Sequence, residues 1–379
     1  MNSARKIIGV LFLIIFLLSM LAVGAFCIAE ENPAPQIEPL FAKAKVLKVH
    51  ALESYDDFSP VKQIVTLKIL NSKFKGQTIT VEHMPSTMAG MEINVKEGNK
   101  VLLWIDEHPS AAESPDGSPL FAISDFARDN YAYWTILIYA LLLVILGRLK
   151  GVKALASLLI TLFLLFFVLF PLTLKGFNPI LITILIALVV SLVTFRIIGG
   201  KTKKMISATL GTFSGVLLAG IIALLFGKLM HLSGMSTEEA KILLYSLNVK
   251  IDFQGILFSG IIIGALGAIM DVGMSISSAI NEVRKVHPEA NFKNLFESGM
   301  RVGRDIMGTM ANTLILAYTG GALPLLLLII ASQASISKVI NLELISLEIL
   351  RAMAGSIGLV LCIPMTAAIA AYLYSQEKA

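Results

Sequence analysis

The chain has 379 residues, of which 56% are hydrophobic and only 15% are charged, and its mean hydropathy is +0.80. Soluble domains carry about 45–50% apolar and about 25% charged residues, so this composition excludes an ordinary soluble protein and indicates an integral membrane protein. The net charge of +5 reflects loops that carry Lys and Arg beside apolar segments, so we expect no nucleic-acid binding.

Apolar segments long enough to cross a bilayer recur along the chain, since a spanning helix needs about 17–25 residues. In chain order they are 7–28, 131–147, 154–174, 179–198, 205–230, 253–276, 306–331 and 349–374. We therefore predict an all-α polytopic membrane bundle of about eight transmembrane helices. The segment 131–376 would form a seven-helix transmembrane domain.

The first apolar segment follows Arg5 and Lys6, and residues 1–29 have two interpretations. The apolar run is long for a signal peptide, which favours an uncleaved signal anchor. Cys27-Ile28-Ala29 could also end at a cleavage site, and cleavage would leave seven spans.

A small β-rich domain is predicted after the first segment. Residues 30–42 form a polar, Pro-rich linker. Within 43–127, short runs with strand character occur at 44–50, 63–70, 77–81, 100–106 and 120–126. Five short strands in a segment of this length predict a closed barrel of the OB-like type. His50, His83 and His108 are irregularly spaced within it, so we predict surface histidines rather than a metal site.

The distribution of Lys and Arg predicts the orientation of the bundle. With the N-terminus inside, the inner segments hold 15 basic residues: Arg5, Lys6, Arg148, Lys150, Lys153, Arg196, Lys201, Lys203, Lys204, Arg284, Lys285, Lys293, Arg301, Arg304 and Lys378. The short outer loops hold 6: Lys175, Lys228, Lys241, Lys250, Lys338 and Arg351. We therefore predict a cell-membrane protein with cytoplasmic N- and C-termini and with residues 30–130 extracytoplasmic.

Local patterns predict short helices and interruptions of the spans. Ser236-Thr-Glu-Glu239 has the pattern of a capping box that begins a short amphipathic helix. Residues 288–300 place apolar side chains on one helical face, as in a helix along the inner membrane surface. The pair Gly320-Gly321, followed by Pro324, is expected to interrupt the seventh span, and Pro364 the eighth.

Asp271 lies inside the apolar stretch 251–280. An acidic side chain in a spanning helix costs about 2.5–3.5 kcal/mol on insertion scales, so such a residue is usually paired, hydrated or functional. On helical spacing it shares a stripe with Gly260, Gly264 and Gly267, and small residues let another helix approach closely. This stripe is our strongest sequence-based indication of a functional site.

The seventh span adds polar residues of the same kind. Helical spacing places Arg301, Asp305, Gly308 and Asn312 on one face, with Arg304 beside them. Asp271 with Arg304 would form a structural ion pair, whereas Asp271 with Asp305 could share a proton, as a proton-coupled carrier requires. Both a structural role and a pathway role remain open for Asp271, Arg304, Asp305 and Asn312, with Gly260, Gly264, Gly267 and Gly308 as helix-packing residues.

Catalytic motifs are missing from the sequence. The spans contain no Ser-His, zinc or P-loop pattern, and the sequence context of Asp271 and Asp305 lacks the glycines expected around a membrane aspartyl protease site. We therefore predict no catalytic residue, no metal and no cofactor, so ATP-driven transport would require a separate subunit.

Two blocks of sequence resemble the YibE/F-like family of bacterial multi-pass membrane proteins. They are Gly264-Ala-Leu-Gly-Ala-Ile-Met-Asp-Val-Gly-Met-Ser-Ile-Ser-Ser278 and Gly303-Arg-Asp-Ile-Met-Gly-Thr-Met-Ala-Asn-Thr-Leu-Ile-Leu-Ala-Tyr-Thr-Gly320. The order of an anchor, an outer β-rich domain and a seven-span region is also similar. The resemblance implies a permease-like membrane protein and assigns no functional residue.

Together these features predict a permease or channel-like protein for a small solute or ion. The alternatives are a membrane scaffold or sensor whose outer β-domain binds a partner, and an intramembrane enzyme. The expected partners are the lipid bilayer and either a second copy of the chain or another membrane subunit.

Overall fold

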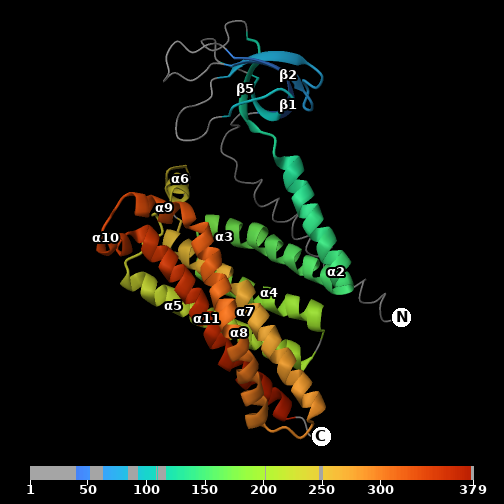
Figure 1. Cartoon of the computed structure of the whole chain (residues 1–379), viewed down its shortest axis with the longest axis vertical. Helices are drawn as coiled ribbons and strands as arrows, with labels where there is room; N and C mark the ends of the chain where they lie inside the picture. The colour runs from blue at the N-terminus through green and yellow to red at the C-terminus, as the bar shows by residue number, and fades with distance from the viewer. Residues whose placement is uncertain are drawn as a thin grey trace. The chain divides into compact units, whose positions relative to one another are not determined.

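The computed structural model describes residues 40–51, 63–83, 93–107, 109, 117–200, 202–246 and 251–376 (Figure 1). The chain divides into two compact units, of which Ala29–Leu142 contains the strands and Leu143–Ala379 contains most of the helices. The predicted first span, 7–28, lies outside the described residues.

The first unit contains a curled antiparallel sheet with the strand order β3-β2-β1-β4-β5. The strands are β1 (Leu40–Ala51), β2 (Gln63–Ile69), β3 (Thr78–His83), β4 (Lys100–Asp106) and β5 (Leu120–Phe126). The five strands predicted from the sequence are thus present, although β1 begins inside the predicted linker. The long β1 pairs with both β2 and β4, and the edge strands β3 and β5 approach each other, which gives a half-barrel.

Alternation along the strands gives this unit its own core. Val65, Leu67 and Ile69 on β2 are buried, as are Val101, Leu103 and Ile105 on β4, while the residues between them are more exposed. Successive side chains of a strand point to opposite faces, so a run of alternating β-branched residues fills one side of the sheet. The inner face of the half-barrel is therefore packed with apolar side chains.

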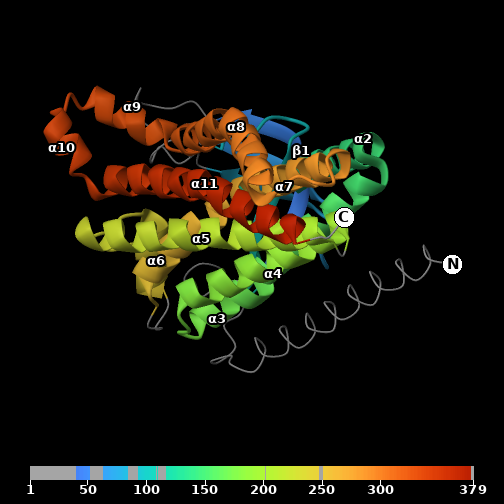
Figure 2. The ribbon, with the colours of Figure 1, turned by 90° about the horizontal axis from the view of Figure 1, so that it is seen from below.

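The second unit is a bundle of long helices. The helical elements are α2 (Asp129–Leu164), η1 (Leu165–Leu169), α3 (Phe170–Leu174), α4 (Pro179–Gly199), α5 (Lys203–Leu229), α6 (Glu238–Ser246), α7 (Phe253–Val286), α8 (Phe292–Gly321), α9 (Leu323–Ala331), α10 (Ile336–Ile340) and α11 (Glu343–Ser375). Helix α11 lies between α5 and α8 (Figure 2). Their length and apolarity are consistent with a protein embedded in a membrane.

The prediction of eight spans is not confirmed. The described helices include five candidate spans, or up to six if α8 and α9, which are bent by 62°, form one span. The first predicted span lies outside the described residues. The predicted spans 131–147 and 154–174 fall within one helical stretch, Asp129–Leu174.

That stretch contains a sharp break at Arg148, whose φ of 49° and ψ of −130° are not helical. Positive φ is unfavourable for a residue with a side chain, so the break is a distinct turn between two arms, 129–147 and 149–174. Gly151 stands where a Cβ would collide with the carbonyl oxygen of Leu143. The apolar pattern placed a loop at 148–153 between two spans, and the structure makes its turn at the first residue of that loop.

Of the two interruptions predicted in the spans, one is confirmed and one is wrong. The chain bends between α8 and α9 at Gly320-Gly321, as predicted. By contrast, α11 runs through Pro364 as a single helix. Buried residues on both sides of the proline, Cys362 and Thr366, pack against α5, and this tertiary packing outweighs the local preference.

The short helices also follow the predicted patterns with small differences. Helix α6 begins at Glu238, and Thr237 rather than Ser236 caps it, with its Oγ1 accepting a hydrogen bond from the Ala240 N–H. The predicted surface helix 288–300 is the first part of the continuous helix α8, capped by Asn291.

Candidate functional site

Helix α7 presents its small and acidic residues on a face that points out of the bundle. Gly260, Gly264, Gly267, Asp271 and Ser275 are all exposed. They recur at intervals of three and four residues, which is the repeat of one helical face. Sequence spacing therefore grouped these residues correctly, and the structure adds that no other helix of the described chain covers most of this stripe.

The glycines of this stripe differ in their surroundings. A Cβ on Gly260 or Gly267 would have no neighbouring atom within 4 Å, and the same holds for Gly308 on α8. A Cβ on Gly264 would lie 2.5 Å from the Tyr318 Oη. Only Gly264 thus contributes to a close helix contact within the chain.

Helix α8 is divided into an apolar and a polar face. Leu295, Gly299, Gly303 and Leu314 are buried against α7 and α11. The exposed residues on the opposite side are Arg301, Arg304, Asp305, Gly308, Thr309 and Asn312. The polar face of this helix, like the stripe on α7, points out of the bundle.

Contacts at both ends of the α7–α8 interface fix the alignment of these antiparallel helices. The contacting pairs are Gly264 with Tyr318, Gly303 with Ile276, and Gly299 with Ile280. Counting along both helices from these pairs places Asp271 level with residues 308–311. Asn312 is level with residues 267–270 and Arg304 with 275–278. The polar groups of the two helices therefore occupy the same depth in the bundle.

Within the described chain these groups do not contact one another. No hydrogen bond or ion pair between described residues joins Asp271 to Arg304, Asp305 or Asn312. Both the ion pair and the carboxylate pair expected from the sequence stay predictions. Asn312 lies on the side of α8 opposite the buried Gly303, so its side chain points away from the bundle.

The outward faces of the neighbouring spans are different in character. Leu181 and Leu185 on α4 are each 63% exposed, and Ile221 and Leu225 on α5 are similarly exposed. The outward residues of α11 are Ile349, Met353, Ile357 and Met365. These apolar faces suit contact with lipid, whereas the outward face of α7 and α8 carries ionisable groups.

The inner side of α7 is held firmly by α5 and α11. Ser207 Oγ donates a hydrogen bond of 3.0 Å to Ser277 Oγ, and Cys362 Sγ lies 3.7 Å from the carbonyl oxygen of Ile269. A Cβ on Gly273 would lie 2.6 Å from Thr212 Oγ1, so α5 and α7 are in close contact. This packing fixes the rotation of α7 and hence the direction in which Asp271 points.

Tyr318 is a site residue that sequence reasoning did not identify. Its buried hydroxyl has no hydrogen-bond partner among the described residues. Arg351 and Glu348 on α11, which form an ion pair at 3.0 Å, are near enough to act on it electrostatically. A single tyrosine in an apolar segment gives no pattern from which its position beside Gly264 could have been derived.

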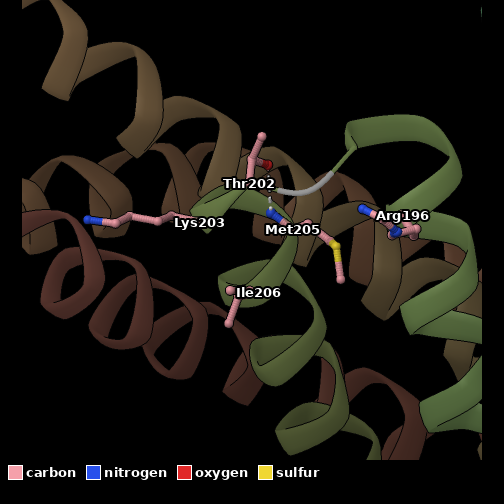
Figure 3. A pocket seen from close by; sticks show the side chains of 5 residues that line it. All are labelled: Arg196, Thr202, Lys203, Met205 and Ile206. Atoms are coloured by element: carbon pink, nitrogen blue, oxygen red, sulfur yellow. Dashed lines mark hydrogen bonds between the residues drawn. The ribbon is translucent and has the colours of Figure 1, made fainter. Parts of the chain in front are cut away.

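A cavity of about 430 Å³ lies where α4 meets the start of α5 (Figure 3). It is lined by Arg196, Thr202, Lys203, Met205 and Ile206. Thr202 Oγ1 caps α5 by accepting a hydrogen bond from the Met205 N–H. Figure 3 shows Arg196 and Lys203 pointing in different directions, and Lys203 donates a hydrogen bond to the carbonyl oxygen of Leu373. The cavity therefore does not bring the two cations together around one ligand.

The histidines of the β-unit do not form a cluster in the part of the chain that is described. The prediction of a surface position is wrong for His83, which is buried where its Nε2 lies 2.8 Å from the carbonyl oxygen of Ile93. Among the described residues, no three His, Cys, Asp or Glu side chains are placed to hold a metal ion. His108 lies outside the described residues.

Comparison with known families gives two matches. The model of a YibE/F-like protein matches residues 135–376, and the model of a YibE/F family N-terminal domain matches residues 42–114. No curated protein and no solved structure matches the chain.

Proposed function

The chain belongs to the YibE/F-like family, and from this premise we propose that it is a multi-pass cell-membrane permease or channel-like protein that moves a small solute or ion without its own ATPase. The observation that carries this proposal is the polar face of α7 and α8. Asp271, Arg304, Asp305 and Asn312 lie on two long helices at similar depth and point away from the apolar core.

The physical argument concerns the cost of these groups in a membrane. An acidic side chain within a spanning helix costs about 2.5–3.5 kcal/mol on insertion scales, and such a residue usually marks an ion or substrate pathway. The inner face of α7 would hold the bundle together without Asp271, because its contacts there are made by small and apolar residues. A purely structural role therefore leaves the acid unexplained.

We also propose the topology that the sequence predicts, with cytoplasmic termini and eight spans. The break at Arg148 supports this count, because two arms joined by a sharp turn can each cross the membrane. Arg148, Lys150 and Lys153 would then lie at the cytoplasmic turn, as the positive-inside rule requires.

A sensor or scaffold role is the second candidate, favoured by the separate core of the β-unit. The strand order and the approach of β3 to β5 support an OB-like barrel on the outer side of the membrane. Barrels of this type bind diverse ligands, so the fold alone selects no partner.

Flux measurements on the purified full chain in liposomes would test the permease proposal. We would challenge the vesicles osmotically with small uncharged solutes and with salts, and follow protons with an enclosed pH-sensitive dye. At least one solute or ion should cross faster than in empty vesicles, and Asp271→Asn should abolish this flux.

Glu282→Gln is the matched control, because Glu282 is an exposed acid on the same helix, about three turns beyond Asp271 near the end of α7, where it pairs with Lys285. This variant should retain the flux. If the folded protein moves none of the probes, the permease proposal is contradicted and the sensor role is favoured.

A further inference from the structure

The polar face of α7 and α8 points to a partner of defined chemistry. We propose that a second copy of this chain covers it, with α7 of each copy packed against α8 of the other. In this arrangement Asp271 of one copy meets the partner's Asn312 and Arg304. The inference rests on the proposed function and deepens it, because the polar site is then incomplete in a single copy.

Lipid is a poor occupant of this face. Hydrocarbon chains offer no hydrogen-bond partner, so the exposed side chains of Asp271 and Asn312, which lie within predicted spans, would remain unsatisfied. The outward faces of α4, α5 and α11 carry Leu, Ile and Met, so the described chain has other surfaces suited to lipid.

The first apolar segment of the chain is also a poor occupant. Residues 7–28 contain no Asp, Glu, Lys, Arg or His. A helix of this composition could pack against glycines, but it could not neutralise Asp271 or the arginines of α8.

A second copy satisfies both the steric and the electrostatic requirements. A twofold axis along the membrane normal keeps equal residues at equal depth, and the interface is then self-complementary. Asp271 of one copy would be level with the partner's Gly308, and Gly267 with the partner's Asn312. Because Gly260, Gly267 and Gly308 have open space where a Cβ would be, the helices can approach closely.

The charges of the two faces are complementary. The stripe on α7 carries the acid Asp271, while the exposed face of α8 carries Lys293, Arg301 and Arg304 against the acids Glu297 and Asp305. Arg304 is four to seven residues, or roughly 6–10 Å, along the helix from the level of Asp271, which an extended Arg side chain and the Asp side chain can span together. Two acid–base contacts would form, one on each side of the axis.

Cross-linking between differently tagged copies tests the contact without any measurement of flux. In a chain with Cys27→Ser and Cys362→Ala, one copy carries Gly267→Cys and the other carries Asn312→Cys. Oxidation in native membranes should give a species of two chains that bears both tags. The lipid-facing pair Leu185→Cys and Leu225→Cys should give none.

A cross-link within one chain controls for folding. A Cβ on Gly299 would lie 3.1 Å from the Ala367 Cβ, so Gly299→Cys with Ala367→Cys should form a disulfide that shows α8 in place. Counting fluorophore bleaching steps in dilute bilayers should give two copies. Gly267→Trp should reduce this to one, whereas Leu185→Trp should not.

The outcomes separate this inference from the proposed function. Two cross-linked copies without flux of any probe would support the interface and remove the permease proposal. Single copies that conduct, or a properly folded α8 without the two-tag species, would overturn the second-copy proposal. A different protein bound in fixed ratio, or Gly267→Cys cross-linking to Ser19→Cys of the same chain, would also overturn it.

Discussion

The hydroxyl of Tyr318 stands against Gly264, at 2.5 Å from the position that a Cβ on this glycine would take. The hydroxyl is buried and has no hydrogen-bond partner in the described chain. We therefore expect Gly264→Ala to lower the stability of the bundle by about 1–3 kcal/mol, the usual cost of overpacking. Thermal melting in detergent measures this.

Tyr318→Phe provides the matching test. Removing the unpaired hydroxyl should be neutral or stabilising by itself, and it should restore most of the stability lost in Gly264→Ala. Gly147→Ala is the control, because a Cβ there has no neighbour within 4 Å. Additive effects of Gly264→Ala and Tyr318→Phe would contradict a direct contact.

Gly358, in the contact between α5 and α11, should be more sensitive to substitution than Gly264. A Cβ there would lie 2.5 Å from the Ala219 Cβ and 2.8 Å from the carbonyl oxygen of Gly215. Backbone cannot move aside as a side chain can, so Gly358→Ala should cost more than Gly264→Ala. Melting temperatures of both variants in the same detergent give the two losses of stability. A larger loss for Gly264→Ala would contradict the close contact of Gly358 with α5.

Asp271→Asn separates the two roles left open for this residue. The amide keeps the shape and hydrogen bonds but cannot carry charge or a proton. A pathway role predicts normal expression and melting with loss of flux. A buried ion pair with Arg304 predicts a loss of about 3–5 kcal/mol, which Arg304→Gln should partly restore. A stable and fully active Asp271→Asn protein would exclude both roles.

The proposed orientation predicts which cysteines an impermeant reagent can reach. Lys285→Cys should stay unlabelled in intact cells and react after permeabilisation, because it would lie on the cytoplasmic side. Glu97→Cys, on an exposed turn of the β-unit, should react in intact cells. The opposite labelling pattern would contradict this orientation and indicate extracytoplasmic termini.

The β-unit is expected to fold by itself as a fragment of residues 40–127. It should give β-type circular dichroism and a cooperative melt. Leu67 is fully buried, so Leu67→Ala should destabilise the fragment by about 2–5 kcal/mol, whereas the exposed Leu47→Ala should change little. A protease-sensitive fragment without a melting transition would argue against an independent unit.

Local patterns predicted the elements of this fold better than their arrangement. The strands followed from β-branched alternation and the bend at Gly320-Gly321 from glycine and proline, because these signals act over a few residues. Pro364 gave a wrong prediction because α5 and α8 pack against α11 on both sides of it. The gap between the predicted spans 131–147 and 154–174 contains the turn at Arg148, but it did not show that the chain is helical on both sides of this one residue.

For the candidate site, the sequence predicted which residues share a helical face but not where that face points. Helical spacing correctly placed Asp271 with Gly260, Gly264 and Gly267 on one face, since periodicity relates residues of one helix to each other. It could not give the direction of that face, because this depends on Gly273 and Ser277 binding α7 to α5. Long-range contacts of this kind leave no local pattern in the sequence.

The position of α11 between α5 and α8 has a consequence for biosynthesis. Helix α5 leaves the ribosome long before α11, yet Gly211 and Gly215 of α5 find their closest contacts on α11. During translation the small-residue face of α5 is therefore in the membrane before its native neighbour, α11, has been made. Insertion of the last helix is the step that completes the bundle, and chains that terminate before Glu343 would present this uncovered face to the quality-control proteases of the cell.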